Sequence, residues 1–193
     1  MPEWSDKDVI ADRGRSLEEE YFRKKDRELI EKMRQASAAA AARAEMGART
    51  GLTDPQLLEE LQALGFTPET VVLVPLVPVI QVAWAEGGVT APERALIMKL
   101  ARARGIAENS AADFQLTDWL ERRPPDEVFT RATRLIRAML AAPGQQHLSA
   151  DDLVKHCESI ASASGGIFGI NRVSAEERQL LTSLAEALKG RAG

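Results

Sequence analysis

The sequence predicts an all-α fold of about eight helices, and two observations carry this prediction. Alanine is the most frequent of the 193 residues, aromatic residues make up only 5%, and the β-branched residues concentrate in one short segment. Such a composition is typical of helices and unlike that of a β-sandwich. The second observation is a recurring capping box, in which a Ser or Thr that starts a helix is followed three residues later by an acidic residue or Gln.

Each predicted helix begins at a local signal. Capping boxes occur at Ser16 with Glu19, Thr53 with Gln56, Thr90 with Glu93, Ser149 with Asp152, and Ser174 with Glu177. Further starts are marked by Thr67 before Pro68, Ser110 before Asp113, and the Pro124 and Pro125 pair before Asp126. Proline is favoured in the first turn of a helix, which supports two of these starts. The predicted helices span residues 16–48, 54–64, 68–86, 91–104, 111–121, 126–142, 150–163 and 175–189.

The first 50 residues differ in character from the rest of the chain. They carry equal numbers of basic and acidic residues, include an Ala-rich run over 36–44, and hold few large apolar residues after Met33. One broken helical stripe is formed by Leu17, Tyr21, Phe22, Leu29, Ile30 and Met33. We expect this stripe to pack on the body or on a second copy in a homodimer, or to dock on another protein. The predicted organisation is a charged, Ala-rich helical arm over 1–50, a short connecting helix over 51–65 and a helical domain over 66–190.

The most apolar segment, residues 71–85, is too short and too interrupted to cross a membrane. A transmembrane helix needs about 20 apolar residues, whereas this segment lies between Glu69 and Glu86 and contains Pro75 and Pro78. Proline removes a helical hydrogen bond and kinks a helix. The segment is therefore predicted to be a buried, bent helix at the centre of the body.

A pattern of helix, Gly-Gly turn and capping box occurs twice in the body. The first copy reads Ala85-Glu86-Gly87-Gly88, followed by Val89-Thr90-Ala91-Pro92-Glu93-Arg94. The second reads Ala163-Ser164-Gly165-Gly166 and, after six residues, Val173-Ser174-Ala175-Glu176-Glu177-Arg178. This repeat predicts two related helical hairpins. Within the second copy, the apolar loop residues Ile167, Phe168 and Ile170 are expected to pack into the core or to form a contact surface.

The first copy also carries a family resemblance. The stretch Pro75-Leu76-Val77, then Val82-Ala83-Trp84-Ala85-Glu86-Gly87-Gly88-Val89 and Glu93, resembles the tellurite-resistance protein TerB family. The second copy is similar to the second half of that family, so the resemblance covers about residues 66–190. It implies an all-α body of two pseudo-symmetric halves and no enzymatic activity. On this basis we expect a non-enzymatic module that binds a protein partner in a stress-response or envelope-related complex.

The resemblance further implies a divalent cation held by carboxylates at the two turns. The matching positions are Glu86, Glu93 and Glu177, with Glu86 in place of the family's Asp and Ser164 where its second half would carry an acid. The spacing itself offers another interpretation. Glu93 and Glu177 each follow a Thr or Ser by three residues, so both are explained as members of capping boxes that complement a helix N-terminus.

A second resemblance concerns the arm and gives the alternative function. The stretch Asp12-Arg13-Gly14-Arg15-Ser16-Leu17-Glu18-Glu19-Glu20-Tyr21 is similar to the start of zeta-type inhibitors of bacterial ATP synthase. It implies a regulator or inhibitor that docks through its N-terminal helix on a larger enzyme such as an ATPase.

Several function classes are disfavoured by composition. The formal charge of −4 and a pI of about 5.4 argue against a nucleic-acid binder. The single cysteine, Cys157, forms no internal disulfide, and no phosphate-binding loop is present. Neighbouring helical residues point about 100° apart, so His156 and Cys157 make a poor catalytic pair, and we expect a hydrogen-bonded surface histidine beside a buried, inert thiol. We predict no catalytic residues and no cofactor, and, without a signal peptide, a cytoplasmic location.

Overall fold

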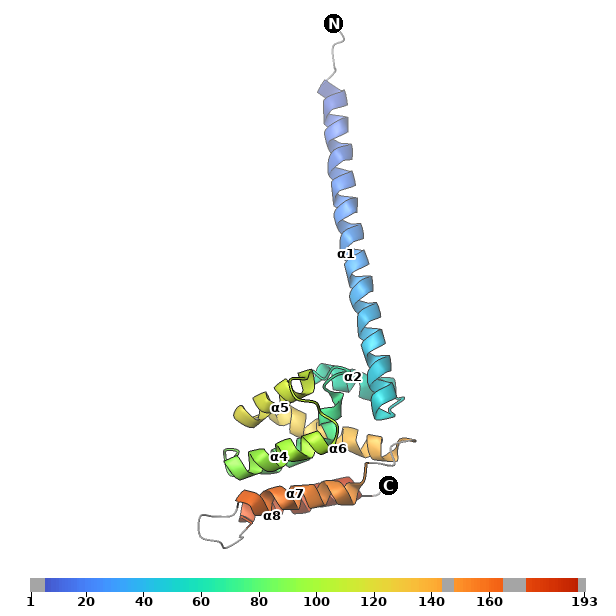
Figure 1. Cartoon of the computed structure of the whole chain (residues 1–193). Helices are drawn as coiled ribbons and strands as arrows, with labels where there is room; N and C mark the ends of the chain where they lie inside the picture. Colours follow the sequence, from blue (N-terminus) through green and yellow to red (C-terminus); the bar gives the residue numbers. More distant parts are fainter. Residues whose placement is uncertain (1–5, 144–147, 165–172, 191–193) are drawn as a thin grey trace. The chain divides into compact units, whose positions relative to one another are not determined.

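The computed structural model describes residues 6–143, 148–164 and 173–190. Over these ranges it contains eight α-helices, one 3-10 helix and no strand, which confirms the predicted all-α class. The chain divides into two units, Met1–Ala42 and Arg43–Gly193. The elements are α1 (Asp6–Thr50), α2 (Pro55–Ala63), η1 (Val71–Leu76), α3 (Val77–Ala83), α4 (Ala91–Ala103), α5 (Ala111–Glu121), α6 (Asp126–Ala141), α7 (Ala150–Ser164) and α8 (Ala175–Lys189) (Figure 1).

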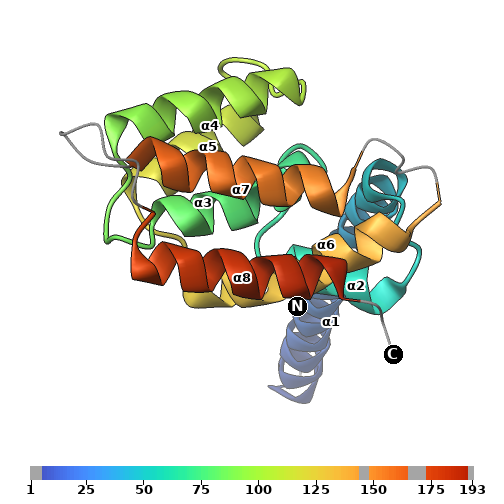
Figure 2. The ribbon, with the colours of Figure 1, turned by 90° about the horizontal axis from the view of Figure 1, so that it is seen from below.

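The core of the second unit is built around α3. This short helix packs against α4, α6, α7 and α8, and α7 also packs against α4 and α8 (Figure 2). The largest fully buried side chains are Met46, Leu61, Leu73, Leu76, Ile80, Ile97, Leu116, Leu120, Leu135, Ile136, Leu153 and Ile160. All of these residues belong to the second unit, so the buried apolar surface that stabilises the protein lies there.

Helix α1 begins at Asp6, and the start predicted at Ser16 is therefore wrong. In the sequence, charged residues of both signs continue before Ser16. The helix ends at Thr50, whose hydroxyl donates to the carbonyl of Met46 at 2.7 Å. Gly51 follows with φ of 73°, the left-handed conformation that glycine adopts readily at a helix end.

The apolar segment is buried as predicted, but it is not one helix over 68–86. Residues Val71–Leu76 form the 3-10 helix η1, and α3 begins only at Val77. Pro75 and Pro78 have no N–H group and so cannot donate the hydrogen bonds of a continuous α-helix. The chain instead tightens into a 3-10 turn. In the described residues, no helix combines the length and the apolar character that crossing a membrane requires.

The other predicted helix starts agree with the structure except at α2. Capping boxes are complete at Thr90 and Ser174, and α5 starts with Ser110 accepting a hydrogen bond from the backbone of Asp113. At α2 the cap is Asp54 rather than Thr53, because the Asp54 carboxylate accepts from the backbone N–H of Gln56 at 2.9 Å.

The repeat is described in its first copy only. There Gly87 has φ of 86° and lies in the turn after α3, and Thr90 then starts α4. In the second copy, Gly165, Gly166 and the apolar loop residues Ile167, Phe168 and Ile170 lie outside the described residues.

Candidate functional site

The predicted carboxylates Glu93 and Glu177 are buried, and both cap a helix. Glu93 Oε2 accepts from the backbone N–H of Thr90 at 2.7 Å and from its hydroxyl at 2.6 Å. Glu177 Oε2 accepts from the backbone N–H of Ser174 at 2.8 Å, and the Glu177 N–H donates to the Ser174 hydroxyl at 3.1 Å. The capping interpretation of these two residues is therefore confirmed.

The same residues form a cluster of negative charge. Burial raises the pKa of the Glu93 carboxyl, and the hydrogen bonds from Thr90 oppose this change. The charges of Glu177 and Glu86 raise that pKa further, so both of these carboxylates lie within electrostatic range of Glu93. Glu86 itself is exposed.

A metal centre does not emerge from this arrangement. In the ranges that the structure describes, no three His, Cys, Asp or Glu side chains are placed so that they could hold a metal ion. Ca²⁺ needs six to eight oxygen ligands and Mg²⁺ a near-octahedral set, whereas Glu93 and Glu177 already bind helix N-termini. Cation binding at Glu86, Glu93 and Glu177 stays a prediction that rests on the resemblance.

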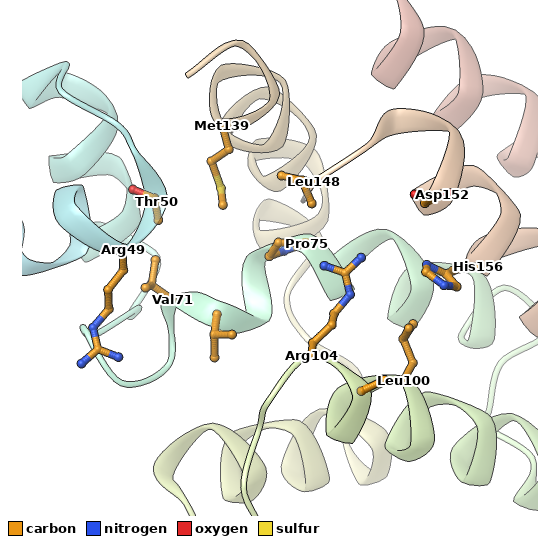
Figure 3. Close-up of a pocket in the computed structure, with 12 residues that line it drawn as sticks. Arg49, Thr50, Val71, Pro75, Leu100, Arg104, Met139, Leu148, Asp152 and His156 are labelled. Atoms are coloured by element: carbon orange, nitrogen blue, oxygen red, sulfur yellow. The ribbon is translucent and has the colours of Figure 1, made fainter. Parts of the chain in front are cut away.

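The second unit contains a cavity of about 710 Å³. Its volume lies in the range of small-molecule sites, about 300 to 1,000 Å³. Most of its lining surface is apolar. Arg104, Asp152 and His156 lie toward one end, and Arg49 and Thr50 lie at the other (Figure 3). The lining residues are Arg49, Thr50, Val71, Val72, Pro75, Leu100, Ala103, Arg104, Met139, Leu148, Asp152 and His156.

Two buried polar atoms of the residues that line this cavity lack a hydrogen-bond partner among the described residues. Arg104 follows the end of α4 and His156 lies on α7, and both extend into the cavity in Figure 3. Arg104 Nε and His156 Nδ1 are both buried without a partner. Burying a polar group without a partner is unfavourable, so such groups call for a structural or functional explanation.

The electrostatics of the polar end follow from burial. Burial lowers the pKa of the Arg104 guanidinium, and the charge of Asp152 opposes this change. Burial also lowers the pKa of His156, and the neighbouring charge of Arg104 lowers it further, again against Asp152. His156 is therefore neutral at neutral pH, while Arg104 supplies a positive charge near the negative charge of Asp152.

The prediction for His156 was wrong, whereas that for Cys157 is confirmed. His156 is half-buried with an unsatisfied Nδ1, because it faces the cavity rather than solvent. Cys157 is buried, and burial raises its pKa to about 12. A thiol with such a pKa stays protonated at neutral pH and is a poor nucleophile.

Sequence reasoning missed the cavity because its parts are far apart in the chain. Arg104 resembles an ordinary basic residue at a helix C-terminus, just before Gly105 with its φ of 81°. One signal was present on α7, where His156 is surrounded in sequence by the buried residues Leu153, Cys157 and Ile160. A polar residue within an apolar helical face is a candidate for the lining of a pocket.

The first unit offers a different kind of site. Its large apolar side chains Tyr21, Phe22, Leu29, Ile30 and Met33 are between 49% and 64% exposed. Tyr21 and Phe22 contact each other edge to face, and Lys25 lies over the Tyr21 ring. A group of exposed apolar side chains of this size marks an interaction surface.

No protein-family model matches the chain, and the searches of curated proteins and of solved structures found no match either.

Proposed function

We propose that the protein is a non-enzymatic protein-binding module, and that its contact surface is the face of α1 centred on Phe22, Leu29 and Met33, with Tyr21 and Ile30 at its two edges. The observation that carries this proposal is the exposure of all five side chains. In the second unit, by contrast, Phe114 is the only large apolar residue among the described ones with comparable exposure. A helix in water gains most of its stability from packing such a face.

The occupant that fits this face is a second copy of the same helix. Along one side of α1, residues recur at alternating steps of four and three, which is the spacing of a coiled-coil seam. The residues of this seam are Phe22, Asp26, Leu29, Met33, Ala36 and Ala40. An antiparallel pair centred between Leu29 and Met33 places Phe22 opposite Ala40 and Asp26 opposite Ala36 of the second copy. Phe22 then faces a small residue, and Leu29 faces Met33 at the centre of the pair.

A parallel pair is less favourable, because it places Asp26 opposite Asp26 of the second copy and Phe22 opposite Phe22. Like charges in direct opposition destabilise a helix interface. The balanced content of acidic and basic residues in this unit is compatible with self-association.

Sedimentation of the full-length protein tests the proposal. We expect a concentration-dependent dimer, which Leu29→Asp converts to a monomer because it replaces the central apolar contact with Met33 of the second copy by a carboxylate, in a seam that already contains Asp26. Lys24→Asp is the matched control, since it introduces the same residue on the opposite side of the helix and should leave the dimer intact.

Orientation is tested by cross-linking. Phe22→Cys with Ala40→Cys should give disulfide-linked dimers under oxidation, whereas Phe22→Cys alone should not, because only the antiparallel pair brings the two positions together. These residues are too far apart on one helix, about 27 Å at 1.5 Å per residue, to bond within one copy. A wild-type monomer at high concentration would contradict self-association. It would leave docking on a larger enzyme, which the N-terminal resemblance implies, as the second candidate function.

A further inference from the structure

We infer that the cavity lined by α4, η1 and α7 binds a small organic carboxylate with an apolar body, held at its charged end by Arg104. This inference is independent of the proposed contact surface on α1. It depends on the shape and chemistry of a site within the second unit.

Two buried polar atoms without hydrogen-bond partners, one on Arg104 and one on His156, indicate where the charged end of the ligand would bind. A guanidinium presents Nε and one Nη as a parallel pair of N–H groups, which matches the two oxygens of a carboxylate. Arg104 Nε is buried without a hydrogen-bond partner, and His156 Nδ1, on the facing helix, is in the same condition. A carboxylate beside Arg104 would satisfy the guanidinium and come within reach of the neutral imidazole.

The apolar residues that line the cavity indicate that the rest of the ligand is apolar. Val71, Val72, Pro75, Leu100 and Leu148, whose side chains are apolar, line the cavity. Burying a hydrocarbon chain against such a wall is favourable by about 0.8 kcal/mol per CH₂ group. The volume of about 710 Å³ accommodates a chain of medium length.

The charge of the site favours a monoanion over a phosphate. Among the described residues that line the His156 end of the cavity, Arg104 is the one cation, Asp152 partly offsets its charge, and burial keeps His156 neutral. Arg49 lies at the opposite end in Figure 3, and its guanidinium pairs with Glu45 at 2.7 Å. A dianion with three oxygens would therefore remain under-compensated, whereas one carboxylate matches the single cation.

The test uses octanoate as the probe, with 1-octanol and butyrate as matched compounds that lack the charge or the apolar body. Calorimetric titration of the full-length protein should show saturable, one-to-one binding of octanoate and at least about tenfold weaker binding of the other two. Arg104→Gln should weaken octanoate binding at least about tenfold and leave octanol binding unchanged. Lys99→Gln, exposed on the same helix and outside the cavity lining, should stay within twofold of the wild type.

A spectroscopic readout locates the ligand without relying on a variant. The chain has two histidines, so His147→Gln assigns the imidazole signals of His156. Octanoate should shift those signals and raise the pKa of His156, because a negative charge joins Arg104 and Asp152 beside the ring. Octanol should not raise it. Leu29→Asp, which alters the α1 face, should bind octanoate as the wild type does.

Three results would each overturn the inference. They are the absence of saturable octanoate binding, equal affinity for octanoate and octanol, and an Arg104→Gln variant that still folds, as judged by its melting curve, and binds octanoate within twofold of the wild type.

Discussion

Glu93 is a residue on which two opposite effects act. The hydrogen bonds from Thr90 favour the ionised carboxylate, but burial and the charges of Glu177 and Glu86 disfavour it more, so its pKa lies above the usual 4.5. A raised pKa in the folded state means that folding favours the protonated carboxyl over the ionised carboxylate. Its contribution to stability is present in full below pH 4.5 and is lost as the pH rises through the higher folded value.

We therefore predict that Glu93→Gln changes stability at pH 7 by less than about 1 kcal/mol. The amide oxygen still accepts the Thr90 hydrogen bonds, and the loss of a favourable charge at a helix N-terminus is offset by the loss of a buried charge. The stability of the variant relative to the wild type should increase as the pH rises from 4.5. Urea unfolding at several pH values checks this, with Glu176→Gln, exposed in the first turn of α8, as the control. A loss of several kcal/mol at pH 7 would contradict it.

The same carboxylates give a prediction for metals. Because Glu93 and Glu177 are already engaged as caps, millimolar Ca²⁺ or Mg²⁺ should not raise the melting temperature. A ligand at 100 times its dissociation constant would stabilise the protein by about 2.7 kcal/mol, which a thermal melt resolves. A cation-dependent rise that Glu86→Gln or Glu93→Gln abolishes would instead support the site implied by the TerB resemblance.

Gly47 is required by a close approach of the backbone. A Cβ atom at this position would lie 2.8 Å from the carbonyl oxygen of Leu52. That oxygen is a backbone atom and cannot turn away as a flexible side chain could. We predict that Gly47→Ala destabilises the protein by about 1 to 3 kcal/mol, despite the higher helix propensity of alanine. Gly88→Ala meets no atom within 4 Å and should be nearly neutral in the same urea titration.

At the scale of elements, the connection between α4 and α5 is fixed by one carboxylate. Asp113 accepts from Arg102 Nη2 at 2.6 Å and from the backbone N–H of Asn109 at 2.8 Å. Asn109 has φ of 59°, a left-handed conformation that asparagine tolerates better than most residues. The hydrogen bond from Arg102 is the main cause of the lowered pKa of Asp113, and the Asn109 N–H adds to it.

A lowered pKa gives a definite pH dependence. The contribution of Asp113 to stability is present above its usual pKa of 3.8 and is lost as the pH falls through the lower folded value. We predict that Asp113→Asn is less stable than the wild type at pH 7 and that the difference closes in acid below pH 3.8. Circular dichroism of both proteins through an acid titration measures it. A difference that persists unchanged at the acid end would show that the ion pair is not its source.

Helix starts were predictable wherever the signal is local. Thr90 with Glu93 and Ser174 with Glu177 form the expected capping boxes, because every interacting atom lies within four residues. The start at Ser16 failed because a solvated charged helix tolerates a serine inside it. The 3-10 helix Val71–Leu76 also escaped prediction, since the chain's response to Pro75 and Pro78 depends on the packing around it.

The candidate sites divide in the same way. Glu93 and Glu177 were identified in the sequence because each belongs to a local capping box, whereas Glu86 was included only through the TerB resemblance. The unpaired Arg104 was not, because its significance comes from His156, which lies on another helix about 50 residues away. No local spacing rule brings two such residues together.

At the scale of the whole molecule, the two units differ in how much apolar surface they bury. Every buried apolar residue of the described chain lies between Met46 and Leu188, in the second unit. A helical segment without a packed face opens readily, with a free energy near that of fraying. The first unit should therefore be the site of early proteolysis when the protein is dilute.

We predict that limited trypsin digestion cuts first within residues 23–34 and later at Arg43. The basic residues in that range are exposed, whereas Arg43 is half-buried and donates to the side chain of Gln62 at 2.8 Å. Mass spectrometry of the early fragments checks the order. If α1 pairs with a second copy, the protection of residues 23–34 from trypsin should increase with protein concentration in the control variant Lys24→Asp. In Leu29→Asp, which should not dimerise, these residues should stay unprotected at every concentration. First cleavage in the second unit would contradict the prediction.

The burial of Cys157 also allows its thiol to report when α7 detaches from the core. A thiol that is both inaccessible and protonated reacts with a disulfide reagent only when α7 detaches from the core, so labelling would follow the rate or population of that excursion. Because Cys157 is the single cysteine of the sequence, the absorbance change on labelling comes from this thiol alone. Comparing the traces with and without octanoate would measure how tightly occupation of the neighbouring cavity holds α7 closed.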